Sequence, residues 1–573
     1  MNQNAEYSAV NDAVRGQFLR KVWALITPYW RSEEKVKAWL LLLVVLGLSL
    51  FSVAVSVWFN SWNRDFYNAL EKKDYDAFTH LLMYFSVIAV VAIVTGVFTS
   101  YLQQMLTIRW RRWLTETYFA KWLSQKNYYH LEYGGYTDNP DQRISEDLNA
   151  FTSSTLSLGL GFISNLVSLV SFSVILWGVS GSIEVWGITI PGYMFWAALV
   201  YAVLGSWLTH LIGRKLIGLS NRQQRFEADL RFSLVRVREN AESIALFNGE
   251  PNEHQQLSAR FGRVWSNFWS IMQLKKRLNF FTSGYSQIAI IFPFVVAAPR
   301  YFSGQIELGV LMQVASAFGS VQGSLSWFVD AYTVLASWRA TCDRLLSFGE
   351  AMEENEGRDM GIELQRQGGN LQMNNLSLDL ADGRHLLDGA NLSVAEGERL
   401  MLSGRSGSGK STLLRAMGNL WPNGHGNIRL PAERYLFLPQ KPYLPIGTLR
   451  GVLSYPQEEG AYPAERYAQV LETCRLAHLT QRLDEANHWQ RMLSPGEQQR
   501  LAFARALLFE PQWLYMDEAT SAMDEEDEAA LYQALIDELP GLSIVSVGHR
   551  SSLKRFHGRH VRIENGQLIE QSV

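Results

Sequence analysis

Long apolar stretches without charge fill the chain before about residue 340 and are missing after it. A helix needs about 20 apolar residues to cross the hydrocarbon core of a bilayer. Six buried helices of a soluble protein are the alternative, but they would leave no polar surface to cover them. The pattern therefore predicts six membrane-spanning helices, at residues 39–59, 81–108, 148–183, 185–209, 278–298 and 308–329.

Lysine and arginine positions indicate which loops face the cytoplasm, because positive residues are retained on that side. They gather before the first span, after the second and after the fourth, for example at Arg20, Arg109 and Arg214. The turns after the third and fifth spans carry few charges. We therefore expect both termini in the cytoplasm. Residues 1–20 are polar, so we expect no cleavable signal peptide.

Two segments beside the first span have an amphipathic pattern. Residues 18–32 mix apolar and basic positions, which predicts an elbow helix lying on the inner membrane surface. Past the span, Trp62, Phe66, Tyr67 and Leu70 recur at helical spacing. We interpret them as a second amphipathic helix that anchors the chain in the outer interface.

A glycine-rich motif follows the apolar run at residues 399–403 and precedes a helical run. The motif fits G-x-x-x-x-G-K-S in the strand, loop and helix context of a phosphate-binding loop. Lys410 is expected to hold the β- and γ-phosphates and Ser411 to ligate Mg²⁺. The residues expected to surround the nucleotide are Gly404, Arg405, Ser406, Gly407, Ser408, Gly409, Lys410, Ser411 and Thr412.

A second acidic element lies downstream of that loop. Residues 513–516 form an apolar run suited to a buried parallel strand, and Asp517 and Glu518 follow it. An acid at the end of such a strand can hold magnesium, and the next carboxylate can act as general base toward a water. We therefore expect Asp517 to ligate Mg²⁺ and Glu518 to be catalytic.

Four further motifs make the chain resemble the ATP-binding-cassette transporters. Leu493–Arg500 (LSPGEQQR) matches the family signature, Gln440 stands at the Q-loop, Ser521–Asp524 resembles the D-loop, and His549 resembles the switch histidine. Their order and spacing agree with the family from about residue 371 to the end. The resemblance implies ATP and Mg²⁺ as cofactors.

The resemblance also implies roles for individual residues. Gln440 would ligate the magnesium and sense the γ-phosphate, and His549 would contact that phosphate. Ser494, Gly496 and Glu497 would bind the nucleotide held by the partner subunit of a homodimer, because each chain has one phosphate loop and one signature.

The signature has the local pattern of a capped helix start, and the chain departs from the family pattern at two places. Ser494 and Glu497 form a capping-box pattern, and Pro495 suits the first helical position. Pro495 and Glu497 stand where the family usually has Gly and Gln. Leu380 occupies the place where many relatives carry an aromatic that stacks on adenine, so a preference for ATP over GTP is left open.

Motifs in the membrane half resemble those of the SbmA/BacA group and of peroxisomal half-transporters. These motifs are residues 59–70, 109–111, 139–144 and 227–229. The order of membrane half and cassette is similar to that of YddA-like bacterial proteins. This resemblance implies a six-helix exporter-type membrane domain joined to an α/β P-loop cassette, in the bacterial inner membrane.

Length and composition agree with this organisation. A chain of 573 residues is expected to form several domains, and a net charge of −3 argues against nucleic-acid binding. Cys342 and Cys474 have no metal-binding or redox spacing. We expect an N-terminal segment with the elbow helix at 1–37, a membrane domain at 38–346, a linker at 347–370 and an ATP-binding cassette at 371–573.

The function that these observations favour is transport driven by ATP hydrolysis, with membrane lipid and a solute as further partners. The solute is expected to be hydrophilic or amphipathic, peptide-like or cobalamin-like, and taken up. Export or flipping of a lipid-like or acyl substrate, and a nucleotide-gated membrane sensor, are the alternatives. Polar stripes on two spans fit either a solute cavity or helix packing. They consist of Ser157, Ser164, Ser168 and Ser171 on the third span and Gln313, Ser316, Ser320 and Ser324 on the sixth.

Overall fold

The computed structural model describes residues 18–134, 139–185, 188–357, 361–432 and 434–571. The first 17 residues of the expected N-terminal segment lie outside the described part. The chain divides into two compact units. One contains residues 1–124 and 135–353, and the other contains residues 125–134 and 354–573.

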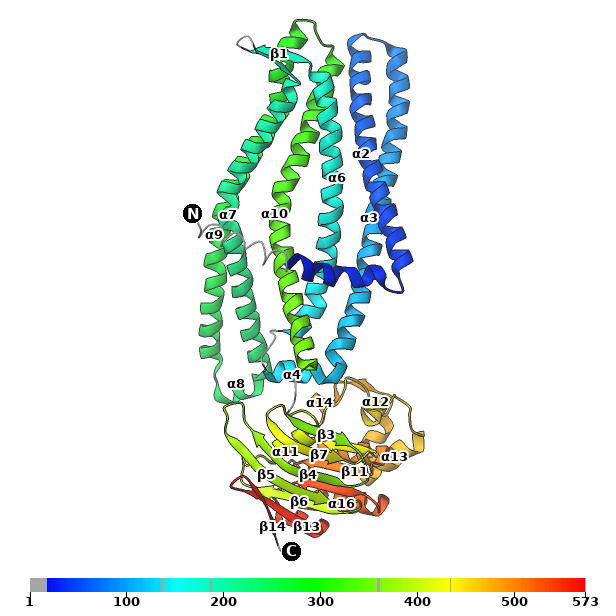
Figure 1. Cartoon of the computed structure of the whole chain (residues 1–573), viewed down its shortest axis with the longest axis vertical. Coiled ribbons are helices and arrows are strands. Elements are labelled where there is room, and N and C mark those ends of the chain that lie inside the picture. The colour runs from blue at the N-terminus through cyan, green and yellow to red at the C-terminus, as the bar shows by residue number, and fades with distance from the viewer. Residues whose placement is uncertain (1–17, 135–138, 186–187, 358–360, 433, 572–573) are drawn as a thin grey trace. The chain divides into compact units, whose positions relative to one another are not determined.

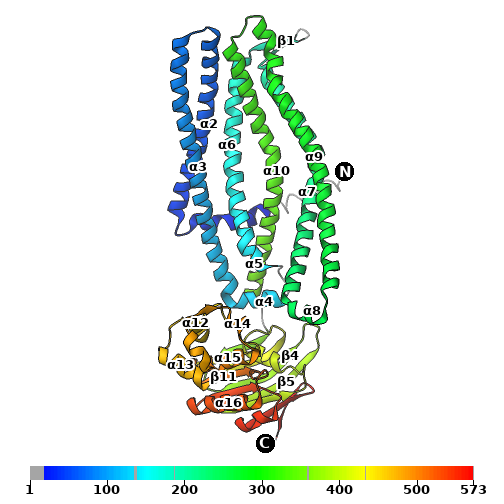
Figure 2. The same ribbon diagram turned by 180° about the vertical axis from the view of Figure 1, so that it is seen from behind.

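The first unit is built from long helices. Residues 18–31 form the expected elbow helix, drawn in dark blue across the others in Figure 1. In the part of the chain that the structure describes, six helices are long and apolar enough to cross a membrane, as predicted. In Figure 2, α2 lies beside α3, and α7 lies beside α9. The long helices are α2 (Lys35–Glu71), α3 (Tyr75–Leu123), α6 (Leu148–Ser180), α7 (Tyr193–Glu239), α9 (Glu250–Phe302) and α10 (Leu308–Glu356).

The predicted bounds of the third and fourth spans were wrong. Helix α6 ends at Ser180, and β1 (Ser182–Val185) pairs antiparallel with β2 (Ile188–Pro191) where helix was expected. Alternating β-branched residues favour an extended strand, and a proline cannot donate a backbone hydrogen bond to continue a helix. Gly192, at φ 61°, then turns the chain into α7.

The expected outer amphipathic helix was also wrong. Residues 62–70 continue α2 without a break, and their aromatic face packs on α3. The Trp62 ring lies 4.8 Å from Phe66 and 4.9 Å from Phe85, and Phe66 lies 5.3 Å from Phe78. Trp62 Nε1 also donates to the Leu81 carbonyl at 2.8 Å. The helical spacing was read correctly, but its apolar face meets a neighbouring helix.

Polar side chains on the sixth span join helices of the same unit. Ser324 donates to Ser168 at 3.2 Å, which links α10 to α6. The buried Gln313 donates to Asn60 Oδ1 at 3.2 Å, and Asn60 Nδ2 returns a bond to the Gln313 carbonyl at 3.1 Å. These contacts support the packing interpretation for Ser168, Ser324 and Gln313.

A buried ion-pair network fixes the start of α6 to α10. Asp147 Oδ2 accepts from Arg143 Nη1 at 2.8 Å and from Arg344 Nε at 2.9 Å, and Oδ1 accepts from Arg344 Nη2 at 2.5 Å. The Asp147 side chain is only 6% exposed. A carboxylate this buried is stabilised by its charged partners and is costly without them.

Among its described residues, the second unit has two main sheets and one short strand pair, β9 (Gly447–Thr448) with β10 (Ala486–Asn487). The larger has the order β14-β13-β6-β12-β11-β8 and the smaller β3-β7-β4-β5. The larger contains β6 (Arg399–Gly404), β8 (Tyr435–Leu438), β11 (Trp513–Asp517), β12 (Ser543–Val547), β13 (Arg559–Glu564) and β14 (Gln567–Gln571). The smaller contains β3 (Ile362–Arg366), β4 (Leu371–Asp379), β5 (His385–Val394) and β7 (Gly424–Leu430). Helices around them are α11 (Lys410–Met417), α12 (Leu449–Ser454), α13 (Ala464–Thr473), α14 (Trp489–Met492), α15 (Pro495–Phe509) and α16 (Glu525–Glu538).

Strand β11 is buried on both faces. Trp513 and Tyr515 belong to one apolar cluster, and Leu514 and Met516 belong to the other. This arrangement explains the uninterrupted apolar run, because a central parallel strand covered on both sides has no polar face.

The segment expected to be a linker is mostly regular structure. Residues 347–356 continue α10, and Ile362–Arg366 form strand β3 paired in parallel with β7. A second piece of chain joins this unit from far upstream, as η1 (Ser124–Lys126) and α4 (Asn127–Gly134). It is part of the excursion between the second and third spans. Residues 125–134 of that excursion belong to this unit.

Candidate functional site: a nucleotide site at one sheet edge

Parallel strands bring the expected site residues to one edge of the larger sheet. Strand β6 pairs in parallel with β12, β12 with β11, and β11 with β8. The carboxyl ends of parallel strands lie at the same edge, which is where open α/β sheets bind ligands. The phosphate loop follows β6, Gln440 follows β8, Asp517 and Glu518 end β11, and His549 follows β12.

The phosphate loop has the backbone of an anion cradle. Gly404, Gly407 and Gly409 have φ angles of 149°, 77° and 100°, a region that L side chains rarely adopt. Lys410 begins α11, and its Nζ donates to the carbonyls of Gly404 and Arg405 at 3.0 Å each. Burial lowers the Lys410 pKa, while the nearby acidic groups oppose that shift. Lys410 therefore ties the start of α11 to the first two residues of the phosphate loop.

One buried hydroxyl in this loop fits a phosphate ligand. Ser408 Oγ is buried and has no hydrogen-bond partner among the described residues. A buried hydroxyl without a partner costs free energy, and a phosphate oxygen would accept from it. A bound nucleotide would therefore satisfy a group that the folded chain leaves unsatisfied.

Ser411 and Asp517, the two residues expected to ligate Mg²⁺, are in direct contact. Ser411 Oγ donates to Asp517 Oδ1 at 2.8 Å. Burial raises the Asp517 pKa, with the Ser411 hydrogen bond opposing it. A hydroxyl and one carboxylate are hard oxygen ligands, and Mg²⁺ usually takes one or two carboxylates together with phosphates and water. The residues present therefore fit magnesium held with a nucleotide.

Glu518 is held between two of the other predicted site residues. Its Oε2 accepts from Gln440 Nε2 at 3.1 Å, and its Oε1 lies 3.1 Å from His549 Nε2. Glu518 has φ 46°, a strained angle for a residue with a side chain. Its backbone N–H donates to Val547 on β12 at 3.1 Å. The strained turn at the end of β11 therefore positions a carboxylate beside the amide and the imidazole.

The signature forms a capped helix start apart from the phosphate loop. Ser494 caps α15 and Glu497 completes the capping box, as predicted. Among the described residues, no hydrogen bond or ion pair links Ser494, Gly496 or Glu497 to the phosphate loop of the same chain. A Cβ at Gly496 would lie 3.1 Å from the Ala522 carbonyl, so a larger residue would crowd the D-loop.

His478 is a contact that the sequence analysis missed. Its Nε2 lies 3.1 Å from Glu497 Oε1. Burial acts to raise the Glu497 pKa, but the Ser494 hydrogen bonds outweigh it, with His478 and Arg500 adding charge, so the pKa is lowered. No pattern near His478 signals this contact, because 19 residues separate the pair.

Gln499 is the second residue that the sequence analysis missed. This buried side chain donates to the Gln440 carbonyl at 2.9 Å and to Ser521 Oγ at 3.2 Å, and it accepts from Ala522 N at 2.9 Å. It therefore ties the signature helix to the Q-loop and the D-loop. Its place within the signature motif was the available signal.

Leu380, at the expected adenine position, follows β4 and packs half-buried against the core around that sheet.

Residues 125–134, which include helix α4, also contact the region of the phosphate loop within this unit. Lys126 donates to the Gly418 carbonyl just past α11, and the Tyr133 ring lies 5.2 Å from Trp421. These contacts connect the segment after α3 to the helix that carries the phosphate loop.

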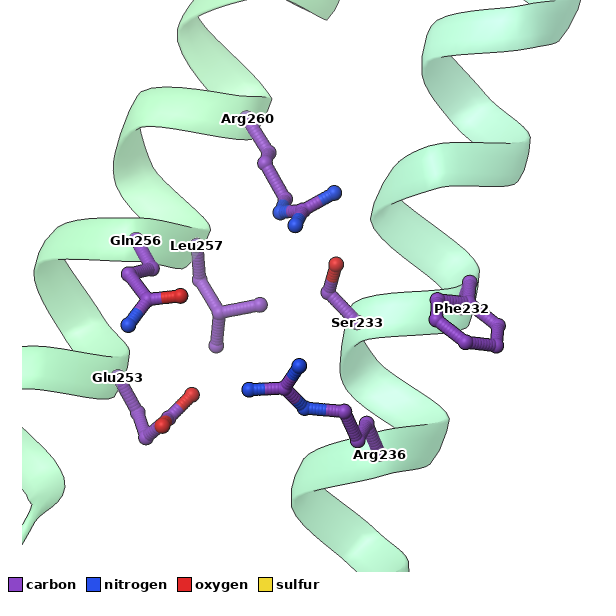
Figure 3. Close-up of a pocket in the computed structure, with 7 residues that line it drawn as sticks. All are labelled: Phe232, Ser233, Arg236, Glu253, Gln256, Leu257 and Arg260. Atoms are coloured by element: carbon purple, nitrogen blue, oxygen red, sulfur yellow. The ribbon is translucent and has the colours of Figure 1, made fainter.

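Figure 3 shows a pocket between α7 and α9 in the first unit. Arg236, Glu253 and Arg260 point toward one another across it. Its volume is about 20 Å³, which is room for a single water rather than for a solute. The lining residues are Phe232, Ser233, Arg236, Glu253, Gln256, Leu257 and Arg260.

Together, these features define a multi-pass membrane protein joined to a P-loop nucleotide hydrolase. Residues 25–302 match the family described as ABC transporter transmembrane region 2, and residues 387–521 match ABC transporter. The chain therefore belongs to the ABC transporters, as a half-transporter with its membrane domain fused to an ATP-binding cassette. It couples ATP hydrolysis to transmembrane transport.

Relatives cover almost the whole chain. ABC transporter D family member 2, chloroplastic, of Arabidopsis thaliana is 35% identical, over 95% of this chain and 86% of its own length. The inner membrane ABC transporter ATP-binding protein YddA of Escherichia coli is 34% identical, over 93% and 95%. The human lysosomal cobalamin transporter ABCD4 is 28% identical, over 96% and 95%. The structure of a bacterial Atm1-family ABC exporter with ATP bound has a TM-score of 0.74 at 17% identity, covering 95% of this chain and 96% of that one, which shows the fold.

Proposed function

We propose that two copies of this chain form an importer that moves a hydrophilic or amphipathic solute, peptide-like or cobalamin-like, across a bacterial inner membrane. The observation that carries the proposal is one chain with six spans and a hydrolytic site at the edge of its sheet. YddA is an inner membrane ABC transporter ATP-binding protein and human ABCD4 is a lysosomal cobalamin transporter, and these relatives support an inner membrane location and a cobalamin-like solute. The basic residues flanking the spans support cytoplasmic termini.

In the proposed reaction, Lys410 and the N–H groups of residues 404–412 hold the phosphates of ATP. Ser411, Asp517 and Gln440 would hold Mg²⁺, and a bound Mg²⁺ would supply charge neutralisation for the phosphates. Glu518 accepts a proton from the attacking water, and its neighbour His549 contacts the γ-phosphate. In the structure, Gln440 donates to Glu518, so its amide oxygen is free to turn to the metal.

The lack of a direct hydrogen bond between the described residues of the phosphate loop and the signature of one chain supports the proposed dimer. The phosphate loop and the signature of one chain have no hydrogen bond between them among the described residues. The signature offers a capped helix start, which attracts phosphate. In a symmetric pair, Ser494, Gly496 and Glu497 of each subunit would complete the site of the other.

The test is ATP-driven movement of solute in sealed liposomes that hold only the purified chain, with the cassettes facing outward. A short peptide and cobalamin, each labelled, are enclosed in the lumen. Import releases them when ATP and Mg²⁺ are added outside, and Lys410→Ala abolishes release. Liposomes with the same amount of Lys410→Ala serve as the matched control for leakage.

Each other outcome identifies a different function. ATP-dependent uptake into the lumen against a gradient would reverse the direction to export. Movement of a labelled lipid between leaflets, with both solutes retained, would favour a lipid substrate. Solute flux that needs ATP binding but persists in Glu518→Gln would favour a nucleotide-gated sensor. A fully active monomer, shown by mass measurement in lipid, would refute the dimer.

A further inference from the structure

A polar cavity lies between α3 and α6, outside the nucleotide site. It has a volume of about 490 Å³, within the roughly 300–1,000 Å³ typical of small-molecule sites. Five lining residues belong to the apolar stretch 81–108, and four to the first turns of α6. The lining residues are Ser100, Gln103, Gln104, Thr107, Ile108, Arg111, Asn149, Ser153, Ser154 and Ser157.

Nine of the ten residues that line this cavity are polar or charged, although their aliphatic parts make up much of its wall. Ile108 is the one aliphatic residue among them. Thr107 and Ser153 donate to carbonyls of their own helices, at 2.9 Å each. No hydrogen bond of the Gln103 side chain occurs with any described residue, so its amide is available to a ligand. A small number of polar groups that converge on a cavity is what fixes the orientation of a bound small molecule.

Arg111 is the one charged residue in the lining. Its Nη1 donates to Asn149 Oδ1 at 3.2 Å and its Nη2 to the Ser145 carbonyl at 3.1 Å. Within the described part of the chain, Arg111 forms no ion pair, and the lining has no carboxylate. A guanidinium has five N–H donors in a planar fork that matches carboxylate and phosphate. Both partners lie at the start of α6 or just before it, so they hold the guanidinium at the cavity while leaving donors free.

We propose that this cavity binds an oxyanion-bearing polar solute, with the carboxylate or phosphate of the solute on Arg111 and its neutral part on the amides and hydroxyls of α3 and α6. This inference rests on the proposed transport function and names the substrate class. The same oxyanion chemistry could come from a soluble solute or from an anionic lipid headgroup.

The test labels a cysteine at position 153 in the full-length chain, in phosphatidylcholine nanodiscs without nucleotide. The native Cys342 and Cys474 are buried, and burial raises the pKa of both thiols, so they are poor competitors for the reagent. Ser153→Cys is treated with sulfonate-bearing and with trimethylammonium-bearing thiosulfonates. We expect Arg111→Gln to lower the ratio of anionic to cationic labelling rates by about tenfold, and Arg111→Lys to keep most of it, because the positive side chain attracts the sulfonate and repels the trimethylammonium group.

The occupant is then identified by protection. N-acetyl-trialanine and glycerol phosphate carry an oxyanion, whereas N-acetyl-trialaninamide and glycerol are their neutral counterparts. We expect the two anions to slow labelling of Ser153→Cys at concentrations at least about tenfold lower than the neutral compounds, and to lose this advantage in Arg111→Gln. Slower labelling in nanodiscs that contain phosphatidylglycerol would assign the site to a lipid headgroup.

Two outcomes would overturn the proposal. A cysteine at 153 that reacts with neither reagent would mean that the cavity is closed to solutes. Equal protection by the anionic and neutral compounds would show that the cavity does not recognise an oxyanion. No change of the labelling ratio in Arg111→Gln would show the same for Arg111. Because these measurements need no ATP, they can succeed when the direction or the coupling of transport proves different, and release from liposomes tests those separately.

Discussion

Glu518→Gln replaces one carboxylate oxygen by an amide and leaves the shape of the side chain unchanged. In the structure, both carboxylate oxygens lie 3.1 Å from their partners, Gln440 and His549. An amide keeps one acceptor and cannot take a proton from water. A positioned general base is typically worth about 10²–10⁴-fold in rate. At about 1.4 kcal/mol for each factor of ten, the loss corresponds to ~2.7–5.4 kcal/mol of transition-state stabilisation.

The assay measures phosphate release and retained ATP on the purified chain in nanodiscs. We expect Glu518→Gln to lose at least about 100-fold in turnover while it keeps ATP bound with Mg²⁺. Lys410→Ala should lose retained ATP instead, because it removes the ammonium that is proposed to hold the phosphates. Glu472→Gln makes the same chemical change at an exposed position on α13 and should behave as wild type. Wild-type turnover in Glu518→Gln would refute its role as general base.

Three further substitutions probe the contacts around the site. Tyr133→Ala removes the ring that packs against Trp421, an aromatic pair worth about 0.5–1.5 kcal/mol. It should raise the ratio of ATP hydrolysed to solute released from liposomes. An unchanged ratio would exclude a role of this contact in coupling ATP hydrolysis to transport. Asp147→Asn should lower the free energy of unfolding by about 3 kcal/mol. This is the low end for a broken buried ion pair, because the Arg344 side chain is 40% exposed. The double variant Asp147→Asn/Arg344→Met should recover part of the loss, as measured by thermal unfolding. The pKa of Glu497 is lowered from its ordinary value of 4.5, so its ionised form stabilises the fold at pH values above 4.5. This stability is lost as the pH falls through the folded pKa, and the unfolding curves of wild type and Glu497→Gln should therefore converge in acid.

Sequence alone determined the features that depend on neighbouring residues. Six spans could be read because the hydrocarbon core requires a long apolar run for each helix. The phosphate loop could be read because its glycines, its lysine and the start of its helix are contiguous, and the capping box of α15 is a local pattern as well. Buried strand β11 was visible because both of its faces are covered.

Tertiary structure decided what depends on residues far apart in the chain. The 3.1 Å contacts of Glu518 with Gln440 and His549 exist because three parallel strands end at one edge, and no local pattern states their distance. Hydropathy cannot separate an extended Ile/Val/Thr segment from the start of a helix, so the β1–β2 hairpin was missed. It also cannot say whether an apolar face meets lipid or a neighbouring helix, which the packing of Trp62 on α3 decided. Polar stripes are ambiguous for the same physical reason: a hydroxyl avoids lipid equally well in a helix contact, as at Ser168 and Ser324, or on a cavity wall.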